Sequence, residues 1–375
     1  MSKISRINYK HIYDVNGEIH VQLSLFDSDD NCGSSTIKMI SDLEKNEEVI
    51  KKIVGLSVAC QNEFDDNLHN LVADFGMLPS IASASSLAAA KLRCEINRTT
   101  LYRDLYDESI TAMPSFLSQL AITGSNRYKN NFNIEQRYPR YSFVIDGFNT
   151  TNDGASCIWS LYRGWSKKIS KKYHLMCEYG DNMFFPPSFA KDDLELFSLM
   201  SEVINEAEFS ANAGIGIDVS AASYYDENSK KYEGLFSKDK YDDNELIAYY
   251  NDLTANYPIA YLSDPLNSFE KASSIIQDDS KIILATSNPG DLWKEDKNIS
   301  VIIDLLHDTT ITEQKKKILE FKANKNKIFC NGTSLENSDF IDMSVAFGLD
   351  LAIGCGPGEY ANRYHAIEEN FLNSF

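Results

Sequence analysis

The sequence has no long apolar run, and it has far less positive than negative charge. Hydrophobic residues make up 43% of the 375 residues. No uninterrupted apolar stretch approaches the roughly 20 residues that a membrane-spanning helix needs. The 36 lysines and arginines face 55 aspartates and glutamates, which gives a formal net charge of -19. Because such a surface repels phosphates, we expect neither a nucleic acid nor a membrane as a partner.

Cysteine pairs and a secretory segment are also lacking. The seven cysteines are scattered, odd in number and without a CxxC pair, which argues against a disulfide framework and against a zinc site. The opening residues, MSKISRINYKHIYD, contain no apolar core of a signal peptide. We therefore expect a cytoplasmic protein with reduced cysteines.

The first third of the chain contains a small β-then-α pattern. Residues 4–26 alternate in hydropathy around an Asp-Val-Asn-Gly turn, which predicts an antiparallel hairpin. Residues 27–36 are polar and predict a loop, whereas residues 37–94 carry apolar side chains at helical spacing. We predict an α+β domain over residues 1–115. Residues 116–140 contain few core residues, so we predict a loop or linker there.

In residues 141–375, short apolar runs that end in polar residues alternate with helical stretches. Most are about 20 to 45 residues apart, which fits the β-helix-β units of a closed barrel better than a sandwich, with strands roughly every 8 to 12 residues. An open doubly wound sheet is the alternative. The predicted strands are residues 142–146, 175–181, 214–220, 259–264, 281–287, 300–304, 327–331 and 351–355.

Acids, amides and hydroxyls stand at the carboxyl ends of these runs, where barrels place their chemistry. The set lacks the usual proton carriers, lysine and histidine, and three evident carboxylates for magnesium. Asp218, which follows the apolar segment AGIGI, is its clearest acid. For Asp264 and Asp304, capping of a following helix is the alternative role. The set is Asp146, Asp181, Asn182, Asp218, Ser263, Asp264, Thr286, Ser287, Asp304, Asn331 and Cys355.

Seven motifs follow one another along almost the full chain: DVNGEIHVQL, CGSST, SLAAAKLRCEINRTTLYRDL, FVIDG, GD, IGIDV and YPIAYLSDP. In this order they resemble motifs of the enolase family. DVNGEIHVQL is similar to the family's opening hairpin, CGSST to its mobile SGAST loop, and SLAAAKLRCEINRTTLYRDL to a helix of its first domain. FVIDG, GD, IGIDV and YPIAYLSDP resemble NVxNGG, GDEGG, IGxDxA and YPIxSIEDP. The resemblance implies an enolase-like α/β fold, with a small N-terminal α+β domain followed by an irregular, partly antiparallel, eight-stranded α/β barrel over residues 141–375. It also implies a homodimer and a magnesium-dependent dehydration of 2-phosphoglycerate.

Carried over position by position, the resemblance implies that the metal site is incomplete. Of the family's three metal-binding carboxylates only the first is present, as Asp218. The second falls on Ser263 and the third on Thr286. The loop serine that can close over the metal is retained as Ser35. One carboxylate cannot replace three as a magnesium cage, so we expect no cofactor, with magnesium only at a residual enolase-type site.

The catalytic residues are replaced as well. The family's base, a lysine, falls on Asp304, and the acid of its second step falls on Asn182. One substrate-contacting histidine falls on Asn331. The remaining candidates are Asp304, Asp181 and Glu178 for catalysis, and Asp264 and Asn331 for substrate binding.

The leading hypothesis is an enolase-like protein that has lost 2-phosphoglycerate dehydration and has a binding or scaffold role. Its partners would be a second copy, a true enolase or another pathway protein. The alternative is a lyase or isomerase of this family that acts on a different substrate, through acid/base work by the barrel carboxylates. A third reading is a divergent magnesium-dependent phosphopyruvate hydratase.

Overall fold

A computed structural model describes most of the chain, which divides into two compact units built from discontinuous segments. Unit 1 contains Met1–Ala112, Asp304–Glu320 and Gly332–Gly348, and unit 2 contains Met113–Ile303, Phe321–Asn331 and Leu349–Phe375. Unit 1 therefore takes in two segments that come long after residue 115. The described residues are 2–13, 19–38, 46–106, 116–123, 139–148, 150–174, 192–275, 282–288, 299–324, 326–331 and 337–351.

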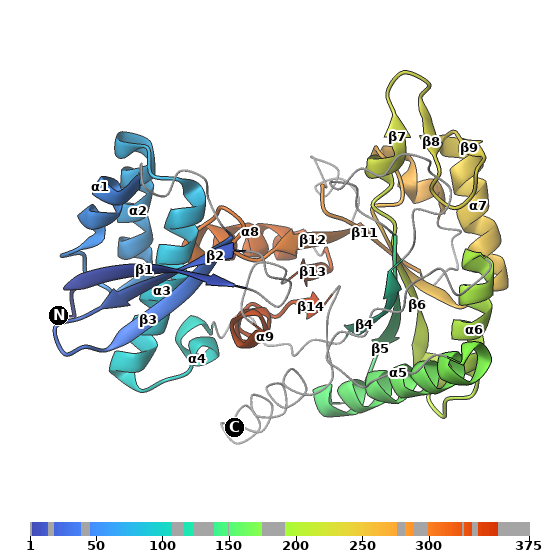
Figure 1. The fold of residues 1–375 in the computed structure, drawn as a ribbon, viewed down its shortest axis with the longest axis horizontal. Helices are drawn as coiled ribbons and strands as arrows, with labels where there is room; N and C mark the ends of the chain where they lie inside the picture. Colours follow the sequence, from blue (N-terminus) through green and yellow to red (C-terminus); the bar gives the residue numbers. More distant parts are fainter. Residues whose placement is uncertain are drawn as a thin grey trace. The chain divides into compact units, whose positions relative to one another are not determined.

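Unit 1 begins with an antiparallel sheet in the order β1-β2-β3 (Figure 1). Strands β1 (Arg6–Tyr13) and β2 (Ile19–Phe26) form the predicted hairpin, with Tyr9 opposite Leu23. Its turn, residues 14–18, lies outside the described residues. The loop predicted over residues 27–36 is wrong in its second half, because β3 (Cys32–Lys38) pairs along β2. Small polar residues form this strand because it packs closely on a helix.

That helix is α3 (Pro79–Asn97), whose small residues let the sheet approach. A Cβ atom at Gly33 of β3 would lie 2.1 Å from the backbone oxygen of Ala88, so only glycine fits there. Leu23, Leu25, Phe64, Leu68 and Leu92 belong to the buried core between the sheet and the helices. The other N-terminal helices are α1 (Glu47–Ile50), α2 (Gln61–Phe75) and α4 (Leu101–Leu105).

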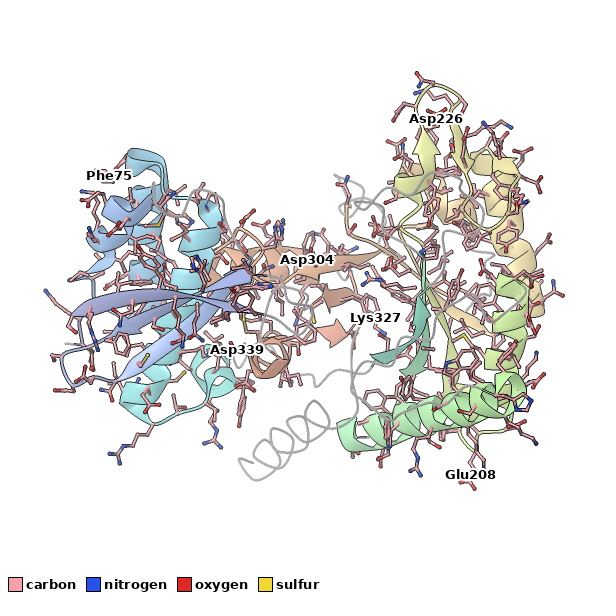
Figure 2. The ribbon with its side chains drawn as sticks, in the orientation of Figure 1. Phe75, Glu208, Asp226, Asp304, Lys327 and Asp339 are labelled. Atoms are coloured by element: carbon pink, nitrogen blue, oxygen red, sulfur yellow. The ribbon has the colours of Figure 1, made fainter. Side chains whose placement is uncertain are left out.

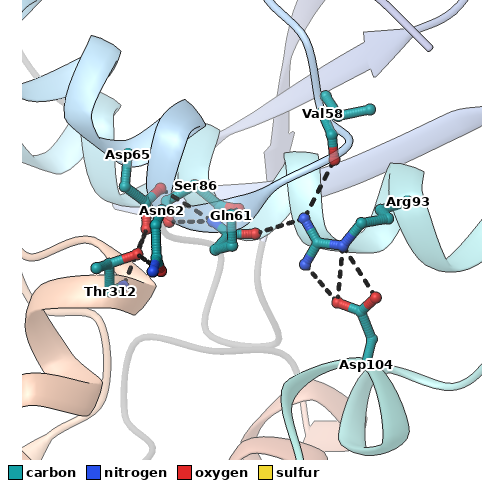
Figure 3. A network of polar contacts seen from close by, with 8 residues as sticks. All are labelled: Val58, Gln61, Asn62, Asp65, Ser86, Arg93, Asp104 and Thr312. Atoms are coloured by element: carbon teal, nitrogen blue, oxygen red, sulfur yellow. Dashed lines mark hydrogen bonds and ion pairs between the residues drawn. The ribbon is translucent and has the colours of Figure 1, made fainter. Parts of the chain in front are cut away.

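Two later helices, α8 (Ile311–Ala323) and α9 (Asn337–Ala346), contribute to unit 1 through residues 304–320 and 332–348. Asp65 of α2 accepts hydrogen bonds from the backbone N–H (2.9 Å) and the hydroxyl (2.6 Å) of Thr312, in the first turn of α8 (Figure 3). At the start of α9, Asp339 pairs with Lys91 of α3 at 2.9 Å. Partly buried polar contacts thus attach both helices to the N-terminal part of unit 1.

Unit 2 contains an eight-stranded sheet in the order β14-β13-β12-β11-β10-β6-β5-β4 (Figure 1). Six of the eight predicted strands are present. Of the last, residues 351–355, the structure describes only Leu351, which ends β14, so that Cys355 lies outside the described residues, as do residues 175–181. β14 also lies against β4, so that the sheet curls as in an irregular α/β barrel. The strands are β4 (Phe116–Thr123), β5 (Arg140–Asp146), β6 (Ala213–Asp218), β10 (Ile259–Ser263), β11 (Ile283–Thr286), β12 (Ser300–Asp304), β13 (Ile328–Asn331) and β14 (Asp350–Leu351).

β4 corrects the prediction that residues 116–140 are a loop or linker. It pairs antiparallel with β5 and begins at Phe116, inside that segment. The segment FLSQLAIT alternates weakly, and the polar residues that follow it, 124–138, dominated the prediction. Residues 124–138 lie outside the described part of the chain.

Strand direction changes within the sheet of unit 2. β6 runs parallel to β10, and β10 parallel to β11, whereas β5 runs antiparallel to β6. Gly216 of β6 is squeezed between its neighbours, since a Cβ atom there would lie 2.6 Å from the Ser142 hydroxyl of β5. Side chains from five strands form a buried cluster of Val144, Tyr261, Ala285, Ile302 and Phe329.

The helices of unit 2 begin at side-chain caps that the sequence encodes. Thr150 caps α5 (Thr151–Tyr173), Asp192 caps α6 (Asp193–Asn205), and Asp242 forms a capping box with Glu245 at α7 (Asp243–Asn256). A second small sheet, β7 (Tyr225–Asp226), β8 (Lys231–Glu233) and β9 (Lys240–Tyr241), precedes α7. None of the described helices combines the length and the apolarity of a membrane span.

Candidate functional site

The candidate site lies where β6, β10 and β11 end in unit 2. Asp218, the last residue of β6, stands opposite Ser263, the last residue of β10, and Ser263 stands opposite Ala285, just before Thr286. The three positions to which the resemblance assigns metal ligands are therefore neighbours, as the sequence predicted from parallel strands.

Arg140 provides the positive charge of this site. It is the first residue of β5, and because β5 runs antiparallel to β6, its register partner is Asp218. The Arg140 guanidinium donates two hydrogen bonds to Oδ2 of Asp218, and the one from Nε is 2.9 Å long. Asp218 is only 8% exposed. A guanidinium thus neutralises a nearly buried carboxylate.

The other oxygen of Asp218 is occupied too. Its Oδ1 accepts hydrogen bonds from the hydroxyls of Ser263, at 3.2 Å, and Ser220, at 3.3 Å. A carboxylate offers about four acceptor positions. With two donors on each oxygen, protein groups fill all of them.

Asp264 forms a second carboxylate centre one residue beyond β10. It accepts hydrogen bonds from the Thr286 hydroxyl (3.0 Å), from the Ser287 backbone (2.9 Å) and from the Ser287 hydroxyl (2.7 Å). Burial raises the pKa of Asp264, the nearby Asp218 charge adds to this rise, and the hydrogen bonds oppose it. Asp264 bridges the ends of β10 and β11 and does not cap a helix.

The backbone is strained at two residues of this site. Ser220 has a φ angle of 50° and Asp264 one of 45°, in the left-handed region that favours glycine. Each such residue costs about 1 to 3 kcal/mol and tends to occur at functional sites. Backbone bonds that continue past the strands, from Val219 N–H to the Ser263 oxygen and from Ala221 N–H to the Asp264 oxygen, both 3.0 Å, hold this geometry.

A magnesium ion fits this donor set poorly. Magnesium prefers carboxylate oxygens and water in an octahedron. Here two of the three positions carry hydroxyls, and Asp218 is already bound to a cationic side chain. Within the residues that the structure describes, no three His, Cys, Asp or Glu side chains are grouped as metal ligands would be.

Several predicted site residues lie elsewhere or outside the described part of the chain. Ser35 is in β3 of unit 1 and is only 2% exposed, so its expected place in a mobile loop is wrong. Asp304 ends β12 (Figure 2), but it is counted with unit 1. Asn331 ends β13, and its side chain is not among those described. Asp181 and Glu178 lie outside the described residues.

Asp146 corrects the predicted set of strand ends. Because β5 is antiparallel to β6, the carboxyl end of β5 lies beside Ala213, at the amino end of β6. There Asp146 pairs with Lys327 at 3.3 Å. Arg140, at the other end of β5, takes the place that the sequence predicted for Asp146. No local pattern signals Arg140, because its position depends on the direction of β5.

Comparisons with known proteins agree on one family. Residues 143–285 match the family described as "Enolase, C-terminal TIM barrel domain", and this segment contains Asp218, Ser263 and Asp264. An enolase of Ehrlichia ruminantium (strain Welgevonden) is 26% identical over 226 residues, which are 59% of this chain and 51% of that protein. This match therefore spans about half of the relative's length.

Longer matches have similar identity. The enolase of Saccharolobus solfataricus is 25% identical over 301 residues, 76% of this chain and 70% of the relative. That of Campylobacter jejuni subsp. jejuni serotype O:23/36 (strain 81-176) is 23% identical over 355 residues, 90% of this chain and 80% of the relative. Together with the curled sheet of unit 2, these matches support the assignment of the chain to the enolase family as a divergent member.

Proposed function

We propose that this protein does not dehydrate 2-phosphoglycerate and that it acts as a binding or scaffold protein built on the enolase fold. The observation that carries the proposal is the saturation of Asp218 by Arg140, Ser263 and Ser220. A metal ion would have to displace the guanidinium from the only carboxylate among the three implied ligands. Removing an α-proton next to a carboxylate needs such cations to hold the enolate.

The charge of the site supports the same proposal. Where three carboxylates hold magnesium at such a site, the bound cation offsets their negative charge and attracts an anionic substrate. In this chain a single carboxylate is neutralised by Arg140, and Asp264 adds negative charge beside it. An anion such as 2-phosphoglycerate gains little electrostatic attraction from this pair of acids.

The first test measures turnover and metal binding of the full chain. We expect no formation of phosphoenolpyruvate above background when 2-phosphoglycerate and magnesium are supplied, and no calorimetric signal for magnesium. Turnover that disappears in Asp218→Ala would contradict the proposal and would favour a divergent phosphopyruvate hydratase.

A second test rebuilds the implied ligand set. The triple variant Arg140→Ala, Ser263→Glu and Thr286→Asp frees Asp218 and places two further carboxylates beside it. We expect this variant to bind magnesium, whereas the matched variant with Gln at position 263 and Asn at position 286 should not. Equal magnesium binding by the wild type and the triple variant would refute the view that the site has been closed to metal.

A lyase or isomerase reaction on another substrate is the second candidate function, and Asp264 is the observation that favours it. A partly buried carboxyl whose pKa is raised has the property of a general acid or base. Incubation of candidate carboxylic acids with the protein in deuterium oxide would reveal exchange at the α-carbon by NMR. Exchange that depends on Asp264, and is lost in Asp264→Asn, would establish this function in place of the first.

A further inference from the structure

The first turn of α8 is held on unit 1 by side chains that lie far away in the sequence. The backbone N–H of Ile311 donates to the Ser86 hydroxyl of α3 at 3.0 Å. The backbone N–H of Thr312 donates to Asp65 of α2 at 2.9 Å, and its hydroxyl donates to Asn62 of α2 at 3.2 Å (Figure 3). The first N–H groups of a helix have no acceptor inside the helix. Here α2 and α3 supply the acceptors, so the attachment of α8 depends on their side chains.

One contact of this turn changes its charge with pH. Nε2 of His69, one helical turn beyond Asp65 on α2, lies 2.7 Å from Oε1 of Glu313. Two acceptor atoms at this distance would repel each other, so Nε2 carries a proton, and the contact becomes an ion pair when both ring nitrogens are protonated. Histidine side chains change charge between about pH 5 and pH 8. The side chains of His69 and Glu313 are 40% and 45% exposed, so protons from the solvent reach this contact without unfolding.

The charged groups around this contact favour attachment in acid. Although burial would raise it, hydrogen bonds from Thr310 and His69 lower the pKa of Glu313, so this carboxylate stays charged across the range in which histidine titrates. Burial raises the pKa of Asp65, so the cost of its buried charge falls as the pH falls. The other side chains within one turn of the contact are Asp66 of α2, Lys316 and Lys317 of α8, and the neutral Ser86 of α3. Of these residue types, histidine is the one that ordinarily changes charge near neutral pH.

The turn closes a strained loop that follows β12. Leu306 has a φ angle of 55° and Asp308 one of 54°, both in the left-handed region. The Ser83 hydroxyl of α3 donates to the Leu306 oxygen, and the Gln314 side chain of α8 accepts from the Leu306 N–H at 3.3 Å. Strain of this kind persists only where surrounding contacts hold it. Release of the first turn of α8 would let this loop relax, and the loop begins at Asp304, where the resemblance places the family's base.

We propose that His69 and Glu313 form a pH-sensitive latch that holds the first turn of α8 on α2 and α3. When His69 is protonated, the ion pair closes the latch. When the pH rises and the positive charge is lost, residues 304–313 open more often from the rest of unit 1. The latch lies within unit 1, and it goes beyond the proposed function because it does not depend on whether the protein has turnover.

Hydrogen exchange of the full chain, followed by mass spectrometry of its peptides, measures this opening. Protection factors remove the intrinsic effect of pH on the exchange rate. We expect the protection factor of residues 305–316 to fall about two- to fivefold between pH 6 and pH 8, the effect of one exposed ion pair. A peptide from α7 in unit 2 is the internal reference and should keep its protection factor. An unchanged protection factor for residues 305–316 would overturn the proposal.

Two substitutions of His69 separate its charge from its place in the structure. His69→Gln keeps a polar side chain without a charge, so residues 305–316 should show the low protection of high pH at both pH values. His69→Lys keeps a positive charge throughout this range, so the same residues should show the high protection of low pH at both values. The control variant is His307→Gln, which removes a histidine of the same segment that is 66% exposed and lies beside Asp308. It should retain the pH dependence of the wild type.

Glu313→Gln removes the other half of the latch and should behave like His69→Gln. Wild-type pH dependence in either variant would overturn the proposal, since a different group would then control the opening. A pH-dependent loss of protection in α7 equal to that in residues 305–316 would also overturn it, because the whole chain and not the latch would then be opening. None of these outcomes bears on turnover of 2-phosphoglycerate, so the proposed function and this inference can fail separately.

Discussion

Two buried aspartates, Asp218 in unit 2 and Asp65 in unit 1, are stabilised in different ways. Asp218 is 8% exposed and shares its charge with the Arg140 guanidinium. Asp65 is 0% exposed and receives only neutral donors, from Thr312, Gln61 and Ser86. Both carboxylates are satisfied, but only the first has a cation in contact with it.

The cation of this network, Arg93, binds a different acid. Arg93 forms a bidentate pair with Asp104, and its Nη1 donates to the Val58 backbone oxygen at 3.3 Å and to the Gln61 side-chain oxygen at 2.9 Å (Figure 3). Gln61 in turn donates to Asp65 at 2.9 Å and so stands between the two. Burial therefore outweighs the hydrogen bonds, and the pKa of Asp65 is raised.

The comparison separates two uses of a buried acid. Next to a guanidinium, a carboxylate stays charged, and its acceptor positions are closed to other cations. Among neutral donors, a carboxylate can accept hydrogen bonds from the start of a helix, as Asp65 does at α8. The free energy of unfolding then depends on pH, because the pKa of the carboxyl is raised. The first arrangement bears on function and the second on the assembly of unit 1.

Breaking the Arg140–Asp218 pair should have the largest effect on stability. Arg140→Ala leaves a nearly buried carboxylate without its cation, and because the Arg140 side chain is 26% exposed we expect a loss of about 2 to 3 kcal/mol in the free energy of unfolding. Urea unfolding measures it. The double variant Arg140→Ala with Asp218→Asn should recover part of the loss, since no unpaired charge remains. If the double variant lost as much unfolding free energy as the two single variants together, the unpaired charge of Asp218 would not be the cause of the loss in Arg140→Ala.

Removing the acid in unit 1 should cost somewhat less. Asp65→Ala leaves the N–H and hydroxyl of Thr312 without an acceptor at the start of α8, and we expect a loss of about 1 to 2.5 kcal/mol. The neighbouring variant Asp66→Ala, at an exposed position of the same helix, serves as the control and should change stability by less than about 0.5 kcal/mol. Equal losses in the two variants would show that α8 does not depend on Asp65.

The sequence predicted the two sites unequally, for physical reasons. Apolar runs that end in Asp218 and Ser263 are local patterns, and parallel neighbours align their ends, so this part of the site followed from the sequence. Arg140 did not, because its place depends on the direction of β5, which no local pattern encodes. The resemblance implied a partly antiparallel barrel, and applying it to β5 would have found Arg140.

The Asp65 network could not be predicted from the sequence. Its partners Gln61 and Ser86 lie 4 and 21 positions away in the chain, but Thr312 is 247 positions away. Only the packing of α8 on unit 1 brings Thr312 to α2. In the same way, Ser35 looked like part of a loop because CGSST is small and polar, whereas close packing of β3 on α3 requires small residues in a strand.

The pH dependence of stability should distinguish the neutral network from the charged pair. The pKa of Asp65 is raised in the folded protein above its ordinary value of 3.8, so the folded state binds the proton more tightly. The stability from this group is full below pH 3.8 and is lost as the pH rises through the folded pKa. We therefore expect Asp65→Asn to be less sensitive than the wild type to a rise of pH above this value. Parallel curves of unfolding free energy against pH for the two proteins would contradict this. The pKa of Asp264 is also raised in the folded protein, so we expect Asp264→Asn to change the pH dependence of stability in the same direction.

The smallest effect should come from the ion pair at the other end of β5. Lys327, labelled in Figure 2, is 31% exposed and Asp146 is 49% exposed. A second acid, Asp350, lies 3.7 Å from the same ammonium group. Solvent screens such a pair, so Lys327→Ala should cost at most about 0.5 to 1 kcal/mol, and moderate salt should remove the difference. The loss measured for Arg140→Ala should persist in the same salt, because its partner is buried. If salt abolished both effects alike, the burial of Asp218 would not be what makes its pairing with Arg140 strong, and Asp218 would remain open to other cations.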